Sequence, residues 1–125
     1  MDEVELLDVI AAGTIANRRD LLTVHDGGAM PDGSAVDAEG CIWNAQWEGN
    51  RVVRYAPDGA VLRIVDLPVS HPTSCVFGGP DLSTLYVTSS CMELSGAQLR
   101  VEPLAGSLFA FEPGVAGRLC TRFAG

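Results

Sequence analysis

The sequence predicts an all-β fold made of short antiparallel strands. Three observations favour this class: apolar residues alternate with period two from about Ser34 onward, turn signals recur at short intervals, and no segment shows a convincing helical stripe of apolar residues. The turn signals are PDGS, DAEG, WEGN, APDG, GGPD and EPGV. The expected strands cover residues 34–38, 41–47, 51–56, 60–66, 73–77, 84–89, 107–112 and 118–123.

An internal repeat groups these strands into units. The segment PDGSAVDAEGCIWNAQW aligns with PTSCVFGGPDLSTLYVTSS, which places Thr73 at the position of Asp32. The hairpin RVVRYAPDGAVLRIVDLP aligns with GSLFAFEPGVAGRLCTRFAG, and a similar hairpin stands at the beginning as VELLDVIAAGTIANRRDLLTV. With the strands of one unit named A to D, the chain is predicted to run C-D, A-B-C-D, A-B-C-D.

Units of four strands and roughly 40 to 50 residues are typical of the blades of a β-propeller. A sandwich or a meander with similar turns is the alternative. The predicted units are a half blade over residues 1–28, a blade over 29–69 and a last blade over 70–125. Because two and a half blades cannot close a ring, the first hairpin is expected to have an unpaired edge. The chain is therefore expected to be the C-terminal part of a larger propeller or one part of an assembly, and to self-associate alone.

Charge and composition argue against several classes of partner. The 125 residues include 16 Asp and Glu against eight Lys and Arg, which gives a net charge of −8. This charge argues against nucleic acid or an anionic membrane as the partner, and no apolar run is long enough to span a bilayer. The acidic N-terminus lacks the basic region of a secretory signal, so the sequence predicts a cytoplasmic protein with four reduced cysteines.

Five stretches of the sequence carry a family resemblance. They are GTIANRR (13–19), MPDGSAVDAEGCIW (30–43), GNRVVRYAPDG (49–59), LPVSHPTSCVFGGPDLSTLYVTSS (67–90) and PLAGSLFAFEPGVAGR (103–118). With these stretches the chain resembles the C-terminal portion of the regucalcin and gluconolactonase family, also called senescence marker proteins. The resemblance implies a six-bladed propeller that binds a divalent cation in its central channel and hydrolyses sugar lactones. A non-catalytic calcium-binding or interaction propeller, or an inactive truncated product, remains the alternative.

Asp32 is the candidate metal ligand. It stands at the head of a predicted A strand, and the innermost strand of each propeller blade lines the channel; the resemblance also implies that the Asp of PDG binds the metal. A hard oxygen donor suits Ca²⁺ first, then Mg²⁺ or Mn²⁺, and is tolerable for Zn²⁺. The simpler interpretation is a turn residue before glycine, as expected for Asp58 in the second PDG. The Glu and Asn ligands that the resemblance implies have no counterpart in these 125 residues.

Three further residues are candidates for a substrate pocket. Thr73 and Ser74 are expected near the channel because Thr73 repeats the position of Asp32, although their hydroxyls alternatively hold the start of a strand. An insertion, CMELSGAQLRVEPLAG, follows the last predicted B strand. It is expected on the face of Asp32, where Met92 would cap the entrance, and the alternative is a surface insertion without a role.

Two other side-chain types were weighed as parts of a site. Cys75 and His71 are four residues apart, and a strand does not bring such a pair together, so nucleophilic catalysis by this cysteine is not expected. Trp43 and Trp47 are expected to pack between blades, with a platform for a sugar ring as the alternative.

Overall fold

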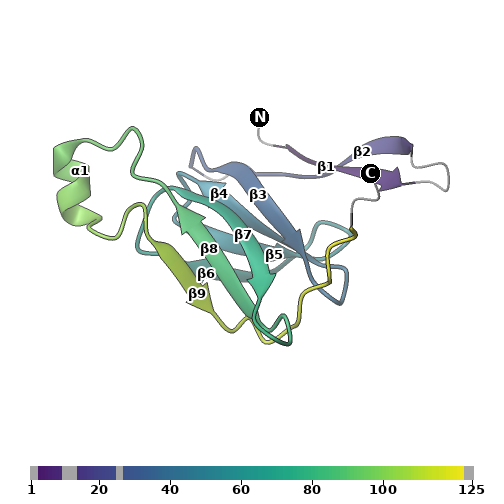
Figure 1. Ribbon diagram of the computed structural model, residues 1–125. Helices are drawn as coiled ribbons and strands as arrows, with labels where there is room; N and C mark the ends of the chain where they lie inside the picture. Colours follow the sequence, from purple (N-terminus) through teal and green to yellow (C-terminus); the bar gives the residue numbers. More distant parts are fainter. Residues whose placement is uncertain (1–2, 10–13, 25–26, 123–125) are drawn as a thin grey trace.

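The computed structural model describes residues 3–9, 14–24 and 27–122 (Figure 1). These residues form nine strands and one short helix. The elements are β1 (Glu3–Val9), β2 (Ile15–Thr23), β3 (Met30–Val36), β4 (Ile42–Trp47), β5 (Arg51–Tyr55), β6 (Val61–Asp66), β7 (Pro72–Gly78), β8 (Thr84–Ser89), α1 (Gly96–Val101) and β9 (Leu108–Phe111). Among the described residues, no helix has the length and apolar character needed to cross a lipid bilayer.

The strands form three antiparallel sheets, as the sequence predicts. Their orders are β1-β2, β3-β4-β5-β6 and β7-β8-β9, so neighbours in sequence are neighbours in each sheet. Figure 1 shows the last two sheets lying against each other, with the β1-β2 hairpin set to one side. No helix lies between residues 34 and 90, all of which are described. This arrangement is that of successive blades of a propeller.

The last sheet has three strands, so the prediction of a fourth strand over 118–123 is wrong for the described residues 118–122. The backbone after β9 finds other partners. Gly117 forms a bridge with Asp37 and donates to the carbonyl of Leu82 at 2.8 Å, and Ala38 donates to the carbonyl of Ala116 at 2.8 Å. These bonds draw the chain toward the end of β3 and away from β9. The outer edge of β9 consequently stays unpaired among the described strands.

The insertion between β8 and β9 contains the helix that the sequence analysis missed. Ser95 caps α1 by accepting from Gln98 N, and the Gln98 side chain accepts from Ser95 N, which makes a capping box. The helix has six residues, none of them buried. It is therefore too short and too solvated to show an apolar stripe, and the S-x-x-Q cap was its only local signal.

The core lies between the second and third sheets. Trp43 is 0% exposed and packs edge-on against Phe77 at 6.4 Å between ring centroids. The guanidinium groups of Arg54 and Arg63 lie 5.8 and 6.0 Å from the Trp43 ring. The remaining members of the buried cluster are Ala45, Val52, Cys75, Leu85 and Val87. Packing between sheets, which the sequence predicts for Trp43, is confirmed.

Each inner strand carries a β-bulge at its repeat-equivalent position. The pairing of β3 with β4 shifts between Pro31 and Ser34, and the pairing of β7 with β8 shifts between Pro72 and Ser74. The residue positions between these pairs include Asp32 in β3 and Thr73 in β7. Bulges bend a strand and re-aim a side chain, and they are over-represented near functional sites. The repeat found in the sequence is therefore present in the backbone itself.

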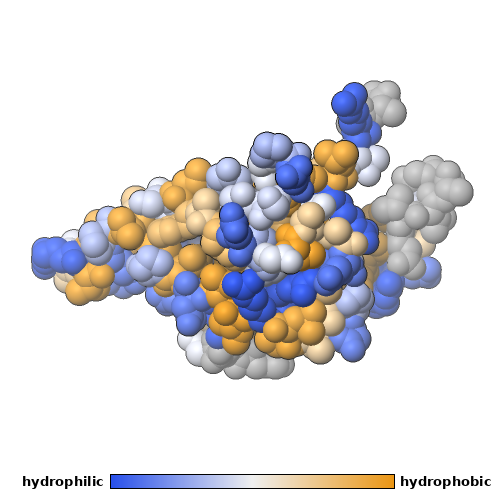
Figure 2. Space-filling model, turned by 90° about the horizontal axis from the view of Figure 1, so that it is seen from below, coloured by the Kyte–Doolittle hydropathy of each residue, from blue (hydrophilic) through white to orange (hydrophobic). Residues whose placement is uncertain are grey.

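The molecule leaves apolar side chains on its surface. Figure 2 shows orange patches between hydrophilic residues on the face seen from below. Large apolar residues that are more than half exposed include Val61 and Ile64 of β6, Val76 of β7 and Leu108 of β9. Val76 and Leu108 belong to the face of the last sheet that points away from the core.

Candidate functional site

Asp32 presents a free carboxylate on β3, the first and edge strand of its sheet. It lies inside β3, because the strand begins at Met30 and not at the predicted residue 34. The side chain is exposed, and no described residue donates a hydrogen bond to it or pairs with it. The backbone is held: the carbonyl of Asp32 accepts from Asn44 Nδ2 at 2.8 Å, and the same amide donates to Ser34 Oγ at 2.9 Å. A fixed backbone with an unbonded carboxylate is suited to binding a cation or a hydroxyl group.

Asp32 opens into a pocket of about 330 Å³. Its lining combines carboxylates with apolar side chains: Met30, Pro31, Asp32, Trp47 and Glu93. Glu93 comes from the insertion after β8, so the insertion does lie on the Asp32 face, as predicted. Met92 is 66% exposed and is not among the lining residues. The neighbouring Glu93 therefore occupies the place at the pocket that the sequence analysis assigned to Met92.

Thr73 and Ser74 make local contacts near the start of β7. Thr73 Oγ1 lies 2.7 Å from Thr88 Oγ1 on the adjacent strand. Ser74 packs against Gly33 of β3, where a Cβ atom added to the glycine would lie 2.2 Å from Ser74 Oγ. Neither residue lines the Asp32 pocket. The contact of Thr73 is consistent with the alternative of a hydroxyl that holds the start of a strand, and the place of both residues at a substrate pocket stays a prediction.

Trp47 forms one wall of the pocket and is backed by a buried histidine. The rings of Trp47 and His71 stack with centroids 3.7 Å apart and planes 9° from parallel. His71 is 1% exposed, and its Nε2 lies 2.9 Å from Oε1 of Glu48. Its Nδ1 has no hydrogen-bond partner. The stack holds Trp47 in one orientation beside Asp32, so this tryptophan does more than pack between sheets.

Cys75 is a structural thiol. Burial raises the pKa of Cys75 to about 12, and its Sγ donates to the carbonyl of Trp43 at 3.2 Å. His71 is engaged with Glu48 and Trp47, so no base faces the thiol. A catalytic pair of Cys75 and His71 is absent among the described residues, as expected from their spacing.

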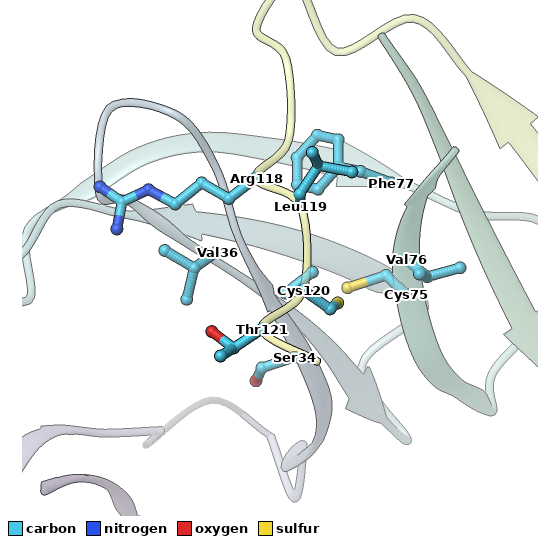
Figure 3. Close-up of a pocket in the computed structure, with 10 residues that line it drawn as sticks. Ser34, Val36, Cys75, Val76, Phe77, Arg118, Leu119, Cys120 and Thr121 are labelled. Atoms are coloured by element: carbon cyan, nitrogen blue, oxygen red, sulfur yellow. The ribbon is translucent and has the colours of Figure 1, made fainter. Parts of the chain in front are cut away.

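A second hollow of about 340 Å³ lies between β3, β7 and the segment 118–121. Figure 3 shows the segment of Arg118, Leu119, Cys120 and Thr121 running beside the inner strands, and Cys75 and Cys120 both line the hollow. The hollow is lined mostly by apolar atoms, and its one charged residue is Arg118. It offers no carboxylate or imidazole, so it lacks the donors that a hard divalent cation requires.

Asp37, Glu39 and Cys41 place their ligand atoms within 4.8 Å of one another, and they are the only such trio among the described residues. Asp37 is already saturated with donors. Its carboxylate accepts from the backbone of Glu39 and Cys41 at 2.9 and 3.0 Å and from Trp43 Nε1 at 3.0 Å. Arg54 adds a bond of 2.8 Å and a compensating charge.

The pKa of Asp37 reflects these bonds. Burial alone raises it, but hydrogen bonds from Arg54, Cys41 and Trp43, together with the Arg54 charge, outweigh burial and lower the pKa below its ordinary value. The carboxylate is thus ionised and fully engaged in holding the turn after β3. We assign the trio to structure and not to metal binding.

Sequence reasoning missed Glu93 and the stacking of His71 on Trp47, although it left a sugar platform at Trp47 open as the alternative. Glu93 lies in an insertion that has no counterpart in the other unit, so the repeat provided no register for it. His71 lies in a connection between blades, where no periodicity applies. The only signal for Glu93 was indirect, because the insertion was expected on the face of Asp32.

Known proteins resemble this chain over most of its length. Residues 2–91 match the family model described as the SMP-30/gluconolactonase/LRE-like region. The chain is 48% identical over 98 residues to the 6-deoxy-6-sulfogluconolactonase of Pseudomonas putida, covering 78% of this chain and 34% of that protein. It is 41% identical over 123 residues to the L-arabinolactonase of Azospirillum brasilense, covering 98% and 40%.

A solved structure shares the fold. The crystal structure of the calcium-binding protein regucalcin from Agrobacterium tumefaciens superposes with a TM-score of 0.76 at 34% identity, covering 82% of this chain and 35% of that one. The chain spans between 34% and 40% of the length of these three proteins. Its sheets correspond to part of a regucalcin-like propeller. The chain belongs to the SMP-30/gluconolactonase/LRE-like family.

Proposed function

We propose that this chain forms part of a metal-dependent sugar-lactone hydrolase, in which Asp32 is one ligand of a divalent cation. The observation that carries the proposal is the free carboxylate of Asp32 on the bulged inner strand, facing a pocket. Family relatives named as lactonases support the reaction class. The calcium-binding description of the regucalcin structure supports a divalent cation.

The donor chemistry of the site fits such an ion only in part. Asp32 offers a hard oxygen that no protein group occupies, which suits Ca²⁺ and is compatible with Mg²⁺, Mn²⁺ or Zn²⁺. A bound cation would polarise the lactone carbonyl and lower the pKa of a coordinated water. However, Asp32 belongs to no trio of close acidic, His or Cys ligands among the described residues. One carboxylate does not define a coordination geometry, so the chain alone is expected to be inactive.

The substrate class follows from the relatives. A sulfogluconolactone and an arabinolactone differ in ring substituents but share the cyclic ester of a sugar acid. The residues of this chain would bind and orient that ring: Asp32 holds the cation, and Trp47 covers one side of the pocket and excludes water. A small-molecule sugar lactone is therefore the proposed substrate.

A chimera tests the proposal. The stretch of the Azospirillum brasilense L-arabinolactonase that matches this chain is replaced by residues 1–125, and acid release from arabinonolactone and gluconolactone is followed with a pH indicator. We expect hydrolysis above the spontaneous rate that depends on added Ca²⁺, Mn²⁺ or Zn²⁺. The chain alone should show none.

Two substitutions decide the role of Asp32 in that chimera. Asp32→Asn should remove metal-dependent hydrolysis, while Asp58→Asn, in the second PDG, should leave it unchanged. A folded chimera that hydrolyses lactone equally well with and without metal would refute the proposal. Metal binding without hydrolysis would instead support the non-catalytic calcium-binding propeller.

A further inference from the structure

We propose that Asn44 is a positioning residue for Asp32: its side-chain amide fixes the bulge of β3 and thereby sets the direction of the Asp32 carboxylate. Asn44 belongs to β4, the strand paired with β3, and it is not among the residues that line the Asp32 pocket. The inference rests on the proposed function for its consequence, because the direction of this carboxylate matters to catalysis only if Asp32 binds a cation.

The Asn44 amide bridges the bulge of β3. The register of β3 against β4 shifts between Pro31 and Ser34, and Asp32 has no register partner on β4. Asn44 Nδ2 donates to the carbonyl of Asp32 at 2.8 Å and to Ser34 Oγ at 2.9 Å. A side chain thus supplies the hydrogen bond that strand pairing does not give to this carbonyl. The two bonds hold the backbone on both sides of Gly33.

The same two bonds leave the other end of the amide without a donor. A carbonyl oxygen only accepts hydrogen bonds, so the NH₂ group has to face Asp32 and the amide oxygen has to point away from it. Asn44 is 1% exposed, and its Oδ1 has no hydrogen-bond partner among the described residues. A buried polar atom without a partner lowers stability. The amide is therefore costly to the fold, which indicates a role other than stability.

The last sheet shows that a bulge of this kind forms without the amide. Asn44 pairs with Ser34 in the middle sheet. Val87 pairs with Cys75 in the last sheet, and the repeat in the sequence makes the two pairs equivalent. Val87 is fully buried in the core, and β7 still has its bulge. The amide thus stands only at the bulge that carries an aspartate, and valine replaces it in the other unit.

A contact with β7 limits how far the bulge of β3 can relax. A Cβ atom added to Gly33 would lie 2.2 Å from Ser74 Oγ, so the backbone of β3 is pressed against the neighbouring sheet at this residue. Loss of the Asn44 amide is therefore expected to free the peptide of Asp32 and not the whole strand. The expected effect is local.

The direction of the Asp32 carboxylate depends on the backbone, because no described residue bonds or pairs with the side chain. A bulge re-aims the side chain that it carries. Groups that orient a metal ligand typically change metal affinity by about 10- to 100-fold when they are removed. Asn44 would act on a cation in this way, through Asp32 and without contact of its own.

Hydrogen exchange of the 125-residue chain in EDTA tests the role of Asn44 without metal. The variant is Asn44→Val, which introduces the residue of the equivalent position in the last sheet. Peptides from β3 should exchange about fivefold faster, while those from β5 and β6 should not change. The melting temperature should stay within about 3 °C of that of the unaltered chain, or rise, because the orphaned amide oxygen is removed. Unchanged exchange in β3, a general loss of protection or a failure to fold overturns the proposal.

Calorimetric titration of the metal-free chimera with Ca²⁺ tests the consequence for the ligand. Asn44→Val should raise Kd about tenfold. Ser34→Ala removes the second acceptor but keeps the bond to Asp32, so Kd should hardly change. Gln46→Leu is the matched control, since Gln46 is also a buried amide of β4 but its side chain bonds to β5. It should leave Kd unchanged. An unchanged Kd in Asn44→Val, or an equal increase in Gln46→Leu, overturns the proposal.

Failure of this inference differs from failure of the proposed function. If hydrolysis by the chimera depends on metal and on Asp32, but Asn44→Val binds Ca²⁺ as tightly as before, the role of Asn44 is wrong and the hydrolase stands. If the chimera shows no metal dependence, while β3 alone loses protection in Asn44→Val, Asn44 positions Asp32 and the hydrolase is wrong.

Discussion

The tripeptide Pro-Asp-Gly occurs twice in this chain, and its two copies do different things. In the second copy, Asp58 Oδ1 accepts from Ala60 N at 3.0 Å and closes the turn between β5 and β6. In the first, Asp32 stands in the bulge of β3 and its carboxylate has no described partner. One aspartate is consumed by its own turn, and the other is left free for a ligand.

The glycines of the two copies differ for equally physical reasons. Gly59 has φ +88°, a left-handed conformation that a side chain resists. Gly33 has no such backbone. It is small because the neighbouring sheet is close: a Cβ atom there would lie 2.2 Å from Ser74 Oγ and 2.7 Å from Ser74 Cα. Gly59 is also close to another segment, since a Cβ atom there would lie 2.7 Å from the carbonyl oxygen of Leu21 in β2, but only Gly59 combines this with a left-handed backbone.

The largest difference between the copies is expected in catalysis. In the chimera, Asp32→Asn should reduce metal-dependent kcat/KM by at least about 1,000-fold, because it removes a charged ligand of the metal. Asp58→Asn should change it less than twofold. Steady-state kinetics with saturating metal measure both. Similar losses in the two variants would show that the free carboxylate has no special role.

The two glycines are expected to differ in whether Ser74→Gly restores the stability that an alanine substitution removes. Gly33→Ala should destabilise the chain by about 3 kcal/mol, because the added methyl overpacks the contact between β3 and β7. Ser74→Gly should recover part of that loss in the double variant. Gly59→Ala should cost at least about 1–2 kcal/mol, because a side chain resists its φ of +88° and the added Cβ atom would lie 2.7 Å from the carbonyl oxygen of Leu21. Ser74→Gly should recover none of this cost. Urea unfolding provides all four free energies; equal rescue of both would contradict this account.

A third aspartate, Asp37, sharpens the contrast, because the stability that it contributes to the fold depends on pH. Its pKa is lowered in the fold from the ordinary 3.8. The stability that it contributes is therefore fully present above about pH 4 and is lost as pH falls through the lowered folded pKa. Asp37→Asn should cost about 2 kcal/mol at pH 7 and flatten this acid limb. Urea midpoints from pH 7 to 2 check both the loss of stability and the flattening.

The smallest expected effect concerns a face that has no neighbour. β3 is packed by β7, but the outer face of the last sheet presents Val76 and Leu108 to solvent. We expect the isolated chain to self-associate through such surfaces, and Leu108→Lys to weaken association by about tenfold. Light scattering across a dilution series measures this. A sharp monomer for the unaltered chain at tens of micromolar, roughly the range relevant to contacts of this kind, would contradict the expectation.

Sequence reasoning predicted the strands of the middle unit closely. β4, β5 and β6 lie within one residue of the expected ranges 41–47, 51–56 and 60–66, because alternation and turn residues are local signals. The resemblance also led to Asp32, whose role as a metal ligand stays a prediction. The strand expected over 118–123 does not form in the described residues 118–122. The backbone of Gly117 instead pairs with Asp37 after β3 and bonds to Leu82 before β8, and no local sequence pattern encodes these contacts.

The sequence by itself determined the class of fold, the repeat of its sheets and the family, since all three reside in periodicity, turn chemistry and motif. Only the tertiary structure decided which of the two Pro-Asp-Gly aspartates would have an unbonded carboxylate, and which second acidic residue would line its pocket. Glu93 lines the same pocket as Asp32 because the insertion after β8 lies on the face of β3, and Trp47 lines it with buried His71 stacked behind. Such proximities arise from packing between segments far apart in the chain, where spacing along the sequence carries no information about distance in space.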